Sequence, residues 1–304
     1  MDKSEMSERL TSVVSSFINY FEMVLPLDVR EKLEELEKCE EKPLQKALYE
    51  AMRTNQKKAL ELSRPSCQDT GVIQFWIKCG SSFPALGVLE ESLREAVRRS
   101  TETLPLRPNT VETFGEYNTK TNIASGAPTV WWDIIPDSDE CEIYVYAAGG
   151  GCSLPGKAEV LMPGGGYEQI VDFVLDRVAL YGPNACPPLF IGVGVGTSCE
   201  TAALNAKKAL MRRVGSHNDN PKAAEMERLL EDALNTLNIG PQGLGGERSV
   251  MGVNIVNTAR HPATLAVAVA FGCWSFRRGH IVFESNLSVS SDTHPEWKYE
   301  GGEA

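Results

Sequence analysis

A chain of 304 residues with 42% hydrophobic and 23% charged side chains has the composition of a folded globular protein, which excludes wholesale disorder and fibrous architectures. The formal net charge of −11 would repel a phosphate backbone, and only short basic pairs such as Arg277-Arg278 interrupt it, so nucleic acid is not an expected partner. An acidic protein can still bind an acidic substrate if basic side chains or backbone N–H groups gather in one pocket.

The N-terminus and the cysteines indicate the cellular compartment. Residues 1–8 are polar and mixed in charge, unlike a secretory signal, and no uninterrupted apolar run is expected to reach membrane-spanning length. The eight cysteines are scattered rather than arranged as a compact disulfide framework, which favours reduced thiols, metal ligands or catalytic groups. We therefore expect a cytoplasmic protein without a membrane partner.

The first sixty residues have helical periodicity, with apolar side chains recurring at helix spacing from about residue 7 to residue 63. Short β-rich runs then alternate with helical stretches. The expected strands are 72–78, 129–135, 141–147, 189–195, 250–256, 265–271 and 280–284. After about residue 285 the sequence is polar and aperiodic. This order predicts a mixed α/β (α+β) fold with a helical lead-in over 1–63, a main domain over 64–284 and a polar tail over 285–304.

Two helices in the second half have recognisable starts. Residues 221–237 carry an apolar stripe, and Asn220-Pro221 supplies a cap and a first-turn proline. Thr197-Ser-Cys-Glu200 has the Thr-x-x-Glu spacing of a capping box, which places Cys199 early in a helix. Glycine is concentrated in the intervening segments, at 149–151, 164–166, 192–196 and 240–246, where backbone amides can approach a ligand closely.

Seven of the eight cysteines fall into two groups. Cys39, Cys79, Cys141 and Cys199 are most simply small hydrophobic residues or surface thiols. Cys67, Cys186 and Cys273 instead lie in turn-forming segments next to predicted strands, where a side chain can point towards a shared site. Their long separations match no Cys-x-x-Cys motif. However, three thiolates around a four-iron cluster would leave one iron open to a substrate hydroxyl, which favours dehydration chemistry over electron transfer.

Several uncommon segments occur together in one order. They are Arg64-Pro-Ser-Cys-Gln-Asp-Thr-Gly71, Leu106-Arg-Pro-Asn109, Ala148-Gly-Gly-Gly-Cys152, Asn184-Ala-Cys-Pro-Pro188, Gly240-Pro-Gln-Gly-Leu244, Ala259-Arg-His-Pro262 and Gly272-Cys-Trp274. Over roughly residues 44–284 the chain resembles the α subunit of the class I, iron–sulfur-dependent fumarase and L(+)-tartrate dehydratase family.

The resemblance implies that Cys67, Cys186 and Cys273 bind a [4Fe–4S] cluster, whose open iron takes the leaving hydroxyl of a four-carbon dicarboxylate while a base removes a proton from the adjacent carbon. It also implies substrate contacts. Gln68 and Asp69 would lie beside the cluster, Arg107 and His261 would reach carboxylates, and Gly150 and Gly151 would offer backbone N–H groups. Asp69 could assist proton transfer or orient Arg107. Without the resemblance, Arg107 would be interpreted as a surface charge, Gly149 to Gly151 as a tight turn, and His261-Pro262 as a capped loop.

The sequence departs from the family pattern in two ways. Single-chain fumarases of this class carry a second domain with further basic substrate-binding residues and the catalytic base. We see no counterpart of that domain in this sequence. We therefore expect a separate β subunit in an assembly of two α and two β chains. Gly151 is followed by Cys-Ser-Leu-Pro-Gly-Lys157, where fumarases usually have a small residue and then Glu-Asn. This wording favours the dehydration of L(+)-tartrate to oxaloacetate, with fumarate–malate interconversion as the alternative.

Two hypotheses lie outside this family. Residues 151–157 nearly spell a phosphate-binding loop, but Ala158 lacks the hydroxyl for Mg²⁺ and Pro163-Gly-Gly-Gly166 leaves little room for the helix that should follow. Gly192-Val-Gly-Val-Gly196 has the wrong spacing for a dinucleotide loop, and close packing of a strand explains it. The other hypothesis is a non-enzymatic scaffold whose thiols are incidental.

Overall fold

The computed structural model describes residues 1–299 and divides the chain into two compact units. Unit 1 consists of Met1–Leu27, Asn55–Gly149 and the chain from Arg277 onward. Unit 2 consists of Asp28–Thr54 and Gly150–Phe276. Because each unit has its own sheet and its own hydrophobic core, the expected α+β fold with an N-terminal helical region is confirmed.

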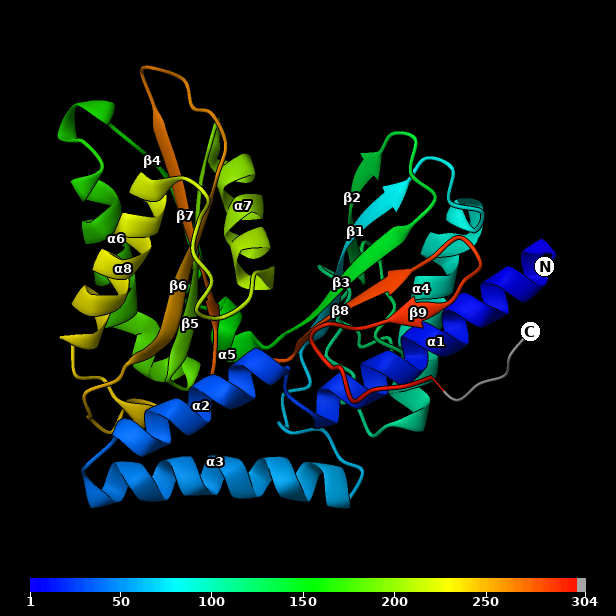
Figure 1. Ribbon diagram of the computed structural model, residues 1–304, viewed down its shortest axis with the longest axis horizontal. Helices are drawn as coiled ribbons and strands as arrows, with labels where there is room; N and C mark the ends of the chain where they lie inside the picture. The colour runs from blue at the N-terminus through cyan, green and yellow to red at the C-terminus, as the bar shows by residue number, and fades with distance from the viewer. Residues whose placement is uncertain (300–304) are drawn as a thin grey trace. The chain divides into compact units, whose positions relative to one another are not determined.

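Unit 1 is built on a five-stranded sheet in the order β2-β1-β3-β8-β9. Its strands are β1 (Val72–Gly80), β2 (Thr129–Ile135), β3 (Cys141–Ala148), β8 (Arg278–Phe283) and β9 (Val289–Ser290). Only the β1–β2 pair is parallel. Helices α1 (Lys3–Met23) and α4 (Leu89–Thr103), which follows the short η1 (Leu86–Val88), lie on one face of this sheet (Figure 1).

The core of unit 1 forms where α1 meets that face. Leu10, Phe17 and Phe21 of α1 are fully buried and pack in one cluster with the inward-facing side chains of β1 and β3, which alternate along each strand. One apolar window within Lys3–Cys39 is long enough to cross a membrane, which the sequence did not lead us to expect, but 67% of it is buried inside the protein. Its burial is that of a core helix.

Unit 2 is built on a four-stranded sheet in the order β4-β7-β5-β6. Its strands are β4 (Lys157–Leu161), β5 (Leu189–Gly196), β6 (Val250–Asn257) and β7 (Leu265–Gly272). Helices α6 (Glu168–Tyr181) and α8 (Pro221–Asn235) cover one face and α7 (Cys199–Met211) covers the other (Figure 1). The chain also forms α2 (Leu27–Cys39), α3 (Pro43–Glu61), α5 (Gly150–Ser153), η2 (Pro163–Gly165), η3 (Gly182–Ala185) and η4 (Pro241–Gly243).

The glycine-rich run of β5 is a buried strand, as the sequence indicated. Ile191, Val193 and Val195 pack into the core with α6 and α8, so the intervening glycines face α7. A Cβ on Gly192 would lie 2.3 Å from the carbonyl oxygen of Ala206. Glycine is therefore required because the backbone of α7 lies directly against the strand.

Two local predictions differ from the structure. The N-cap of α7 is Ser198, and its side chain makes no capping hydrogen bond; the Thr197 hydroxyl instead donates to the carbonyl of Ala259 at 3.0 Å. The capping-box prediction at Thr197 is therefore wrong, although Cys199 does begin the helix. The segment 285–299, predicted from its polarity to be a tail, forms β9 and buries His294 and Trp297. Its few apolar side chains pack beside α1, and because they are not periodically spaced, the sequence did not indicate this packing.

The contact of α7 with β5 gives a testable expectation. A Cβ at Gly194 would lie 1.9 Å from the carbonyl oxygen of Ala202, so Gly194→Ala must displace helix backbone and should lower the free energy of unfolding by about 3 kcal/mol. Gly164 has open space around its Cβ position, and Gly164→Ala should change stability by less than about 0.5 kcal/mol. Urea unfolding followed by circular dichroism measures both. Equal losses would contradict the packing described for β5.

Candidate functional site

Cys186 and Cys273 lie at the same edge of the four-stranded sheet. Cys186 precedes β5 and Cys273 follows β7, and these strands are antiparallel, with Phe190 paired to Gly272. The backbone N–H of Trp274 donates to the carbonyl of Cys186 at 3.1 Å, which joins the two loops. Cys186 is exposed and Cys273 is half-buried. The structure therefore brings these two predicted ligands together with accessible thiols.

The backbone at Cys186 is in an unusual conformation. With φ 54° and ψ 68° it is left-handed, a region that non-glycine residues rarely adopt. Such conformations persist only where surrounding contacts hold them, and they cluster at functional sites. The neighbouring Pro187 supplies such a contact, since its carbonyl accepts from the backbone N–H of Gln242 at 2.9 Å. The loop is thus held from both sides, by Trp274 and by Gln242.

The predicted backbone donors Gly150 and Gly151 are at this edge of unit 2. Both are exposed and form the first turn of the short helix α5, and a Cβ on Gly151 would lie 3.5 Å from the carbonyl oxygen of Asn184, two residues before Cys186. Burial lowers the pKa of Lys207 on α7, while the nearby Cys152 thiol acts in the opposite direction. This edge thus collects thiols, backbone N–H groups and one half-buried amine.

Cys67 belongs to unit 1, in the loop between α3 and β1, and is half-buried. The neighbouring Asp69 is held in a defined orientation because its Oδ1 accepts from the backbone N–H of Gly71 at 3.1 Å and from Asn109 Nδ2 at 3.3 Å. A Cβ on Gly149 would lie 3.2 Å from Asp69 Oδ2, so a glycine is needed beside this carboxylate. Gln68, between the two, is exposed.

Arg107 is connected to the same loop through its backbone. Its N–H donates to the Thr70 hydroxyl at 3.0 Å, and that hydroxyl lies 3.3 Å from the Arg107 carbonyl oxygen. The Arg107 side chain is exposed. Within unit 1 the structure therefore brings Cys67, Gln68, Asp69 and Arg107 into one local constellation. An exposed guanidinium on the segment that is hydrogen-bonded to this loop is a group of the type that binds carboxylates.

A buried ion pair is hydrogen-bonded to the Cys67 loop. Glu22 of α1 and Arg277 are 0% and 3% exposed, and their side chains are 2.6 Å apart. Arg277 Nη2 also donates to the carbonyl of Asp69 at 2.6 Å, and the Glu22 carbonyl accepts from the N–H of Ser66 at 2.8 Å. Burial raises the pKa of the Glu22 carboxyl, and the charge of Arg277 acts in the opposite direction.

His261 is not at the cysteine edge of unit 2. It lies in the connection from β6 to β7, where β5 ends at Gly196, whereas Cys186 and Cys273 lie where β5 begins. The eight residues of β5 separate the two edges by about 25 Å at about 3.3 Å per residue. The ring accepts from the N–H of Ala263 at 3.1 Å, as in a capped loop. The position of His261 does not support a contact with a substrate held beside Cys186 and Cys273.

The donor chemistry of the three cysteines fits an iron–sulfur cluster. Thiolates are its usual ligands, and none of the three side chains is fully buried. Within residues 1–299 no three His, Cys, Asp or Glu side chains surround a point suited to a single metal ion. By contrast, Cys79 and Cys141 face one another across β1 and β3 and are fully buried, so their prediction as small hydrophobic residues is confirmed.

Sequence reasoning missed the residues that orient the site. Asn109 was part of a recognised segment but had no assigned role, and Arg277 was noted only as one of a basic pair. Glu22 had a usable signal: it follows Ile18 by one helical turn, on the apolar stripe of α1, where an acidic residue needs a buried partner. That partner is distant in the sequence, and no local pattern points to it.

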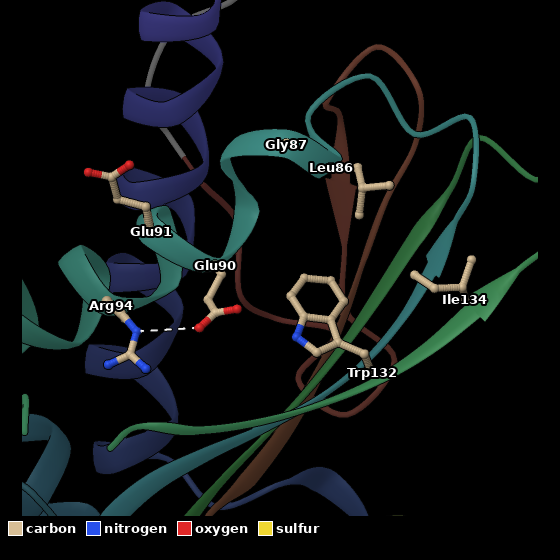
Figure 2. A pocket seen from close by; sticks show the side chains of 7 residues that line it. All are labelled: Leu86, Gly87, Glu90, Glu91, Arg94, Trp132 and Ile134. Carbon is tan, nitrogen blue, oxygen red and sulfur yellow. Dashed lines mark ion pairs between the residues drawn. The ribbon is translucent and has the colours of Figure 1, made fainter. Parts of the chain in front are cut away.

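A separate hollow of about 570 Å³ in unit 1 contains none of the predicted residues. It is lined by Leu86, Gly87, Glu90, Glu91, Arg94, Trp132 and Ile134. Figure 2 shows the Trp132 ring projecting from β2 and the ion pair between Glu90 and Arg94 on α4, whose atoms are 3.5 Å apart. No group in it is poised for chemistry, and no described feature connects it with the cysteines.

The phosphate-binding hypothesis for residues 151–157 is wrong. Residues 150–153 form a single helical turn, and Lys157 begins strand β4 rather than a helix. The Lys157 side chain pairs with Glu159 at 2.5 Å and lies over the Phe173 ring. A phosphate loop needs a helix N-terminus immediately after its lysine. Strand β4 was not predicted, because its exposed residues, Lys157 and Val160, do not follow a two-residue alternation.

Comparison with known proteins gives the class first. The sequence profile described as "Fumarate hydratase (Fumerase)" matches residues 11–282, and this places the chain among the hydro-lyases. The chain belongs to the fumarate hydratase family. It is 49% identical over 293 residues to the L(+)-tartrate dehydratase subunit alpha of Escherichia coli (strain K12), covering 96% of this chain and 97% of the relative. The subunit of the same name from Shigella boydii serotype 4 (strain Sb227) gives the same values. A candidate L(+)-tartrate dehydratase subunit alpha of Methanocaldococcus jannaschii is 34% identical over 273 residues, covering 89% and 96%.

The hydrogen bond from Asn109 to Asp69 predicts a pH-dependent loss of stability. Asn109→Asp would place a second carboxylate beside Asp69, which raises the pKa of one of the two in the folded chain. Above the unfolded carboxyl pKa of about 4 the folded state then binds more protons than the unfolded state, so stability relative to the natural chain falls as the pH rises.

Urea unfolding at pH 5 and pH 8 measures this difference. We expect Asn109→Asp to lose about 2 kcal/mol relative to the natural chain at pH 8 and less at pH 5. Asn109→Ala adds no charge, so its free energy of unfolding should be lowered by the same amount at pH 5 and at pH 8. A deficit for Asn109→Asp that does not change with pH would show that the two side chains are not neighbours.

Proposed function

We propose that this chain is the α subunit of a two-subunit hydro-lyase that dehydrates L(+)-tartrate to oxaloacetate. The observation that carries the proposal is the pairing of the Cys186 and Cys273 loops at one sheet edge, beside the exposed backbone of Gly150 and Gly151. The identity to tartrate dehydratase α subunits over nearly their whole length supports the substrate. Fumarate–malate interconversion is the alternative within the same family.

Cys67, Cys186 and Cys273 would hold a [4Fe–4S] cluster. The accessibility of all three thiols supports this assignment, as does the burial of Cys79 and Cys141, which removes them from consideration. When bound with three protein ligands, such a cluster supplies a Lewis acid that stabilises departing hydroxide. Because thiolates of this kind need a reducing compartment, the proposed location is the cytoplasm.

The residues of this chain would bind and orient the substrate. The exposed Arg107 guanidinium can pair with one carboxylate, and the exposed Gln68 amide can donate a hydrogen bond. Gly150 and Gly151 can offer backbone N–H groups, which carry positive partial charge without adding a titratable group. Together these donors would provide the local positive potential that an acidic chain needs in order to bind a dianion.

Asp69 is the residue of this chain suited to moving a proton. Its Oδ1 is engaged by Gly71 and Asn109, which fixes the carboxylate plane and directs Oδ2 towards Gly149. Dehydration removes a hydroxyl from one carbon and a proton from its neighbour, and the resulting enol becomes oxaloacetate on tautomerisation. A carboxylate held in this way could receive or return that proton, while the partner subunit would supply the remaining acid–base groups.

A β subunit is proposed to complete the enzyme. The relatives are named as α subunits, and this chain covers 97% of the Escherichia coli one, so the same division into two chains is the simplest arrangement. We propose an assembly of two α and two β chains. Coexpression with the β chain, followed by measurement of mass in solution and of activity with and without β, tests it. Full activity of the α chain alone would refute it.

The cysteine assignment predicts that replacing any of the three proposed ligands removes the cluster and the activity, whereas replacing another cysteine does not. Cys67→Ser, Cys186→Ser and Cys273→Ser in the α–β complex should each lose the broad visible absorption of the cluster and reduce activity by more than about a hundredfold. Cys39→Ser, at an exposed position on α2, should retain both. Anaerobic purification with iron and sulfide analysis measures occupancy. Retention of colour and activity in all three variants would overturn the assignment.

The proposed substrate predicts a preference for L(+)-tartrate over malate, and substitutions after Gly151 should change this preference. The complex should dehydrate L(+)-tartrate with a kcat/KM about a hundredfold above that for malate, within the range that pocket contacts provide. Replacing Cys152, Ser153 and Leu154 by Ser, Glu and Asn, the pattern usual in fumarases, should shift this ratio towards malate by at least about tenfold. Leu154 is 66% exposed, so the triple variant should fold. A natural preference for malate would establish the alternative function.

A further inference from the structure

Glu22 and Arg277 are buried charges for which the proposed chemistry has no use. Removing two charges from water is expensive, and a buried ion pair is often no more stabilising than a pair of apolar side chains of similar volume. Stability alone therefore explains poorly why an acidic residue on the apolar face of α1 should meet an arginine at this point. What the pair contacts is more informative than what it contributes to stability.

The pair binds both ends of the segment that contains Cys67. At one end, the Glu22 carbonyl accepts the N–H of Ser66 at 2.8 Å. At the other end, Arg277 Nη2 donates to the carbonyl of Asp69 at 2.6 Å. The only residues between these anchors are Cys67 and Gln68. A four-residue segment that is hydrogen-bonded at one end to the Glu22 backbone and at the other to the guanidinium paired with Glu22 has little freedom to rotate its central side chains.

Arg277 is in turn fixed by the sheet. Its carbonyl accepts from the N–H of Ala147 at 3.1 Å, near the end of β3, and its Nη1 is held by Glu22. The guanidinium thus connects a helix and the Cys67 loop through two different nitrogens, while the Arg277 backbone is bonded to strand β3. The two acceptors are bonded by different terminal nitrogens held in the planar fork of arginine, and the single nitrogen of a lysine cannot occupy both positions.

We propose that Glu22 and Arg277 are positioning residues, whose ion pair holds the Ser66–Asp69 segment so that the Cys67 thiolate and the Asp69 carboxylate are presented in one orientation. Neither residue is assigned a contact with cluster or substrate. The catalytic consequence rests on the function proposed above, whereas the ordering of the segment does not. Residues that orient ligands in this way typically change metal affinity or activity by about ten- to a hundredfold when replaced.

Arg277→Lys and Glu22→Gln are the informative variants, and unit 2 supplies a matched control. Arg212 Nη1 also joins a buried carboxylate, Glu227, at 2.7 Å and a backbone carbonyl, that of Ile255, at 2.9 Å. Ile255 lies near the end of β6, at the sheet edge opposite Cys186 and Cys273. Arg212→Lys therefore makes the same substitution in another pair with a buried carboxylate, away from the cysteines, where a single arginine nitrogen makes both contacts.

Hydrogen–deuterium exchange of the full metal-free chain tests the ordering directly. Amide exchange across residues 64–71 should accelerate at least about tenfold in Arg277→Lys and in Glu22→Gln, because both variants weaken the hydrogen bond from the Arg277 side chain to the Asp69 carbonyl. Arg212→Lys should leave this segment unchanged. If all three variants lower the midpoint of thermal unfolding equally and exchange at residues 64–71 stays at the natural rate, the pair is merely structural and the proposal is overturned. The Glu22→Gln variant keeps the test available if Arg277→Lys fails to fold.

The reconstituted α–β complex tests the catalytic consequence separately. In Arg277→Lys and Glu22→Gln we expect kcat to fall by about ten- to a hundredfold, and the visible absorption of the cluster to be lost faster on exposure to a chelator. Arg212→Lys should match the natural enzyme in both. If the natural complex shows neither cluster nor dehydration while the exchange response is seen, the proposed function fails and the positioning role stands. Natural exchange in an active complex with unchanged kcat would refute the positioning role alone.

Discussion

The buried ion pair between Glu22 and Arg277 is the constraint on which the conformation of the Cys67 loop in unit 1 depends. Four segments that are remote in the sequence meet there: the last turn of α1, the Cys67 loop, the end of β3 and the residue that precedes β8. Because the two charges pair only when α1 and the chain before β8 are both in place, a partly assembled unit would leave a buried charge unpaired, at a cost of several kcal/mol. The pair therefore couples correct folding to correct placement of the loop.

A different constraint organises unit 2, where the controlling factor is steric. Gly192 and Gly194 allow α7 to lie directly on β5, while the intervening valine and isoleucine side chains fill the opposite face with α6 and α8. A strand packed on both faces holds the loops at its ends firmly. The left-handed backbone of Cys186 is one of these ends, and its hydrogen bond to Trp274 makes the two cysteine loops a single rigid edge.

The residues of the proposed function fall in both units. Unit 1 provides a carboxylate, a guanidinium and one thiol, and unit 2 provides two thiols and a turn of exposed backbone. Such a division lets each group be oriented by the core of its own unit. The carboxylate of Asp69 illustrates this, since it is held by Asn109 and Gly71 of the same unit rather than by any ligand.

Local sequence patterns determined the strands and singled out the three cysteine loops, whereas the other candidate site residues came from the family resemblance. The seven predicted strands were found with ends within two residues of the expected positions, because alternating or continuous apolar runs bounded by turn residues are local signals. Strand β4, the second half of the C-terminal segment and the cap of α7 were not found, since each depends on neighbours supplied by the fold. The cysteine loops could be picked out because turns next to strands are also local.

What only the tertiary structure decided is which of these residues meet. It paired Cys186 with Cys273 through antiparallel strands, placed His261 at the opposite edge, and joined Glu22 to Arg277 across the length of the chain. The sequence by itself identified the thiols, the carboxylate, the guanidinium and the fold class. It could not order them, because strand pairing and the burial of a charge are satisfied by partners distant in the chain, and no local periodicity records those partners.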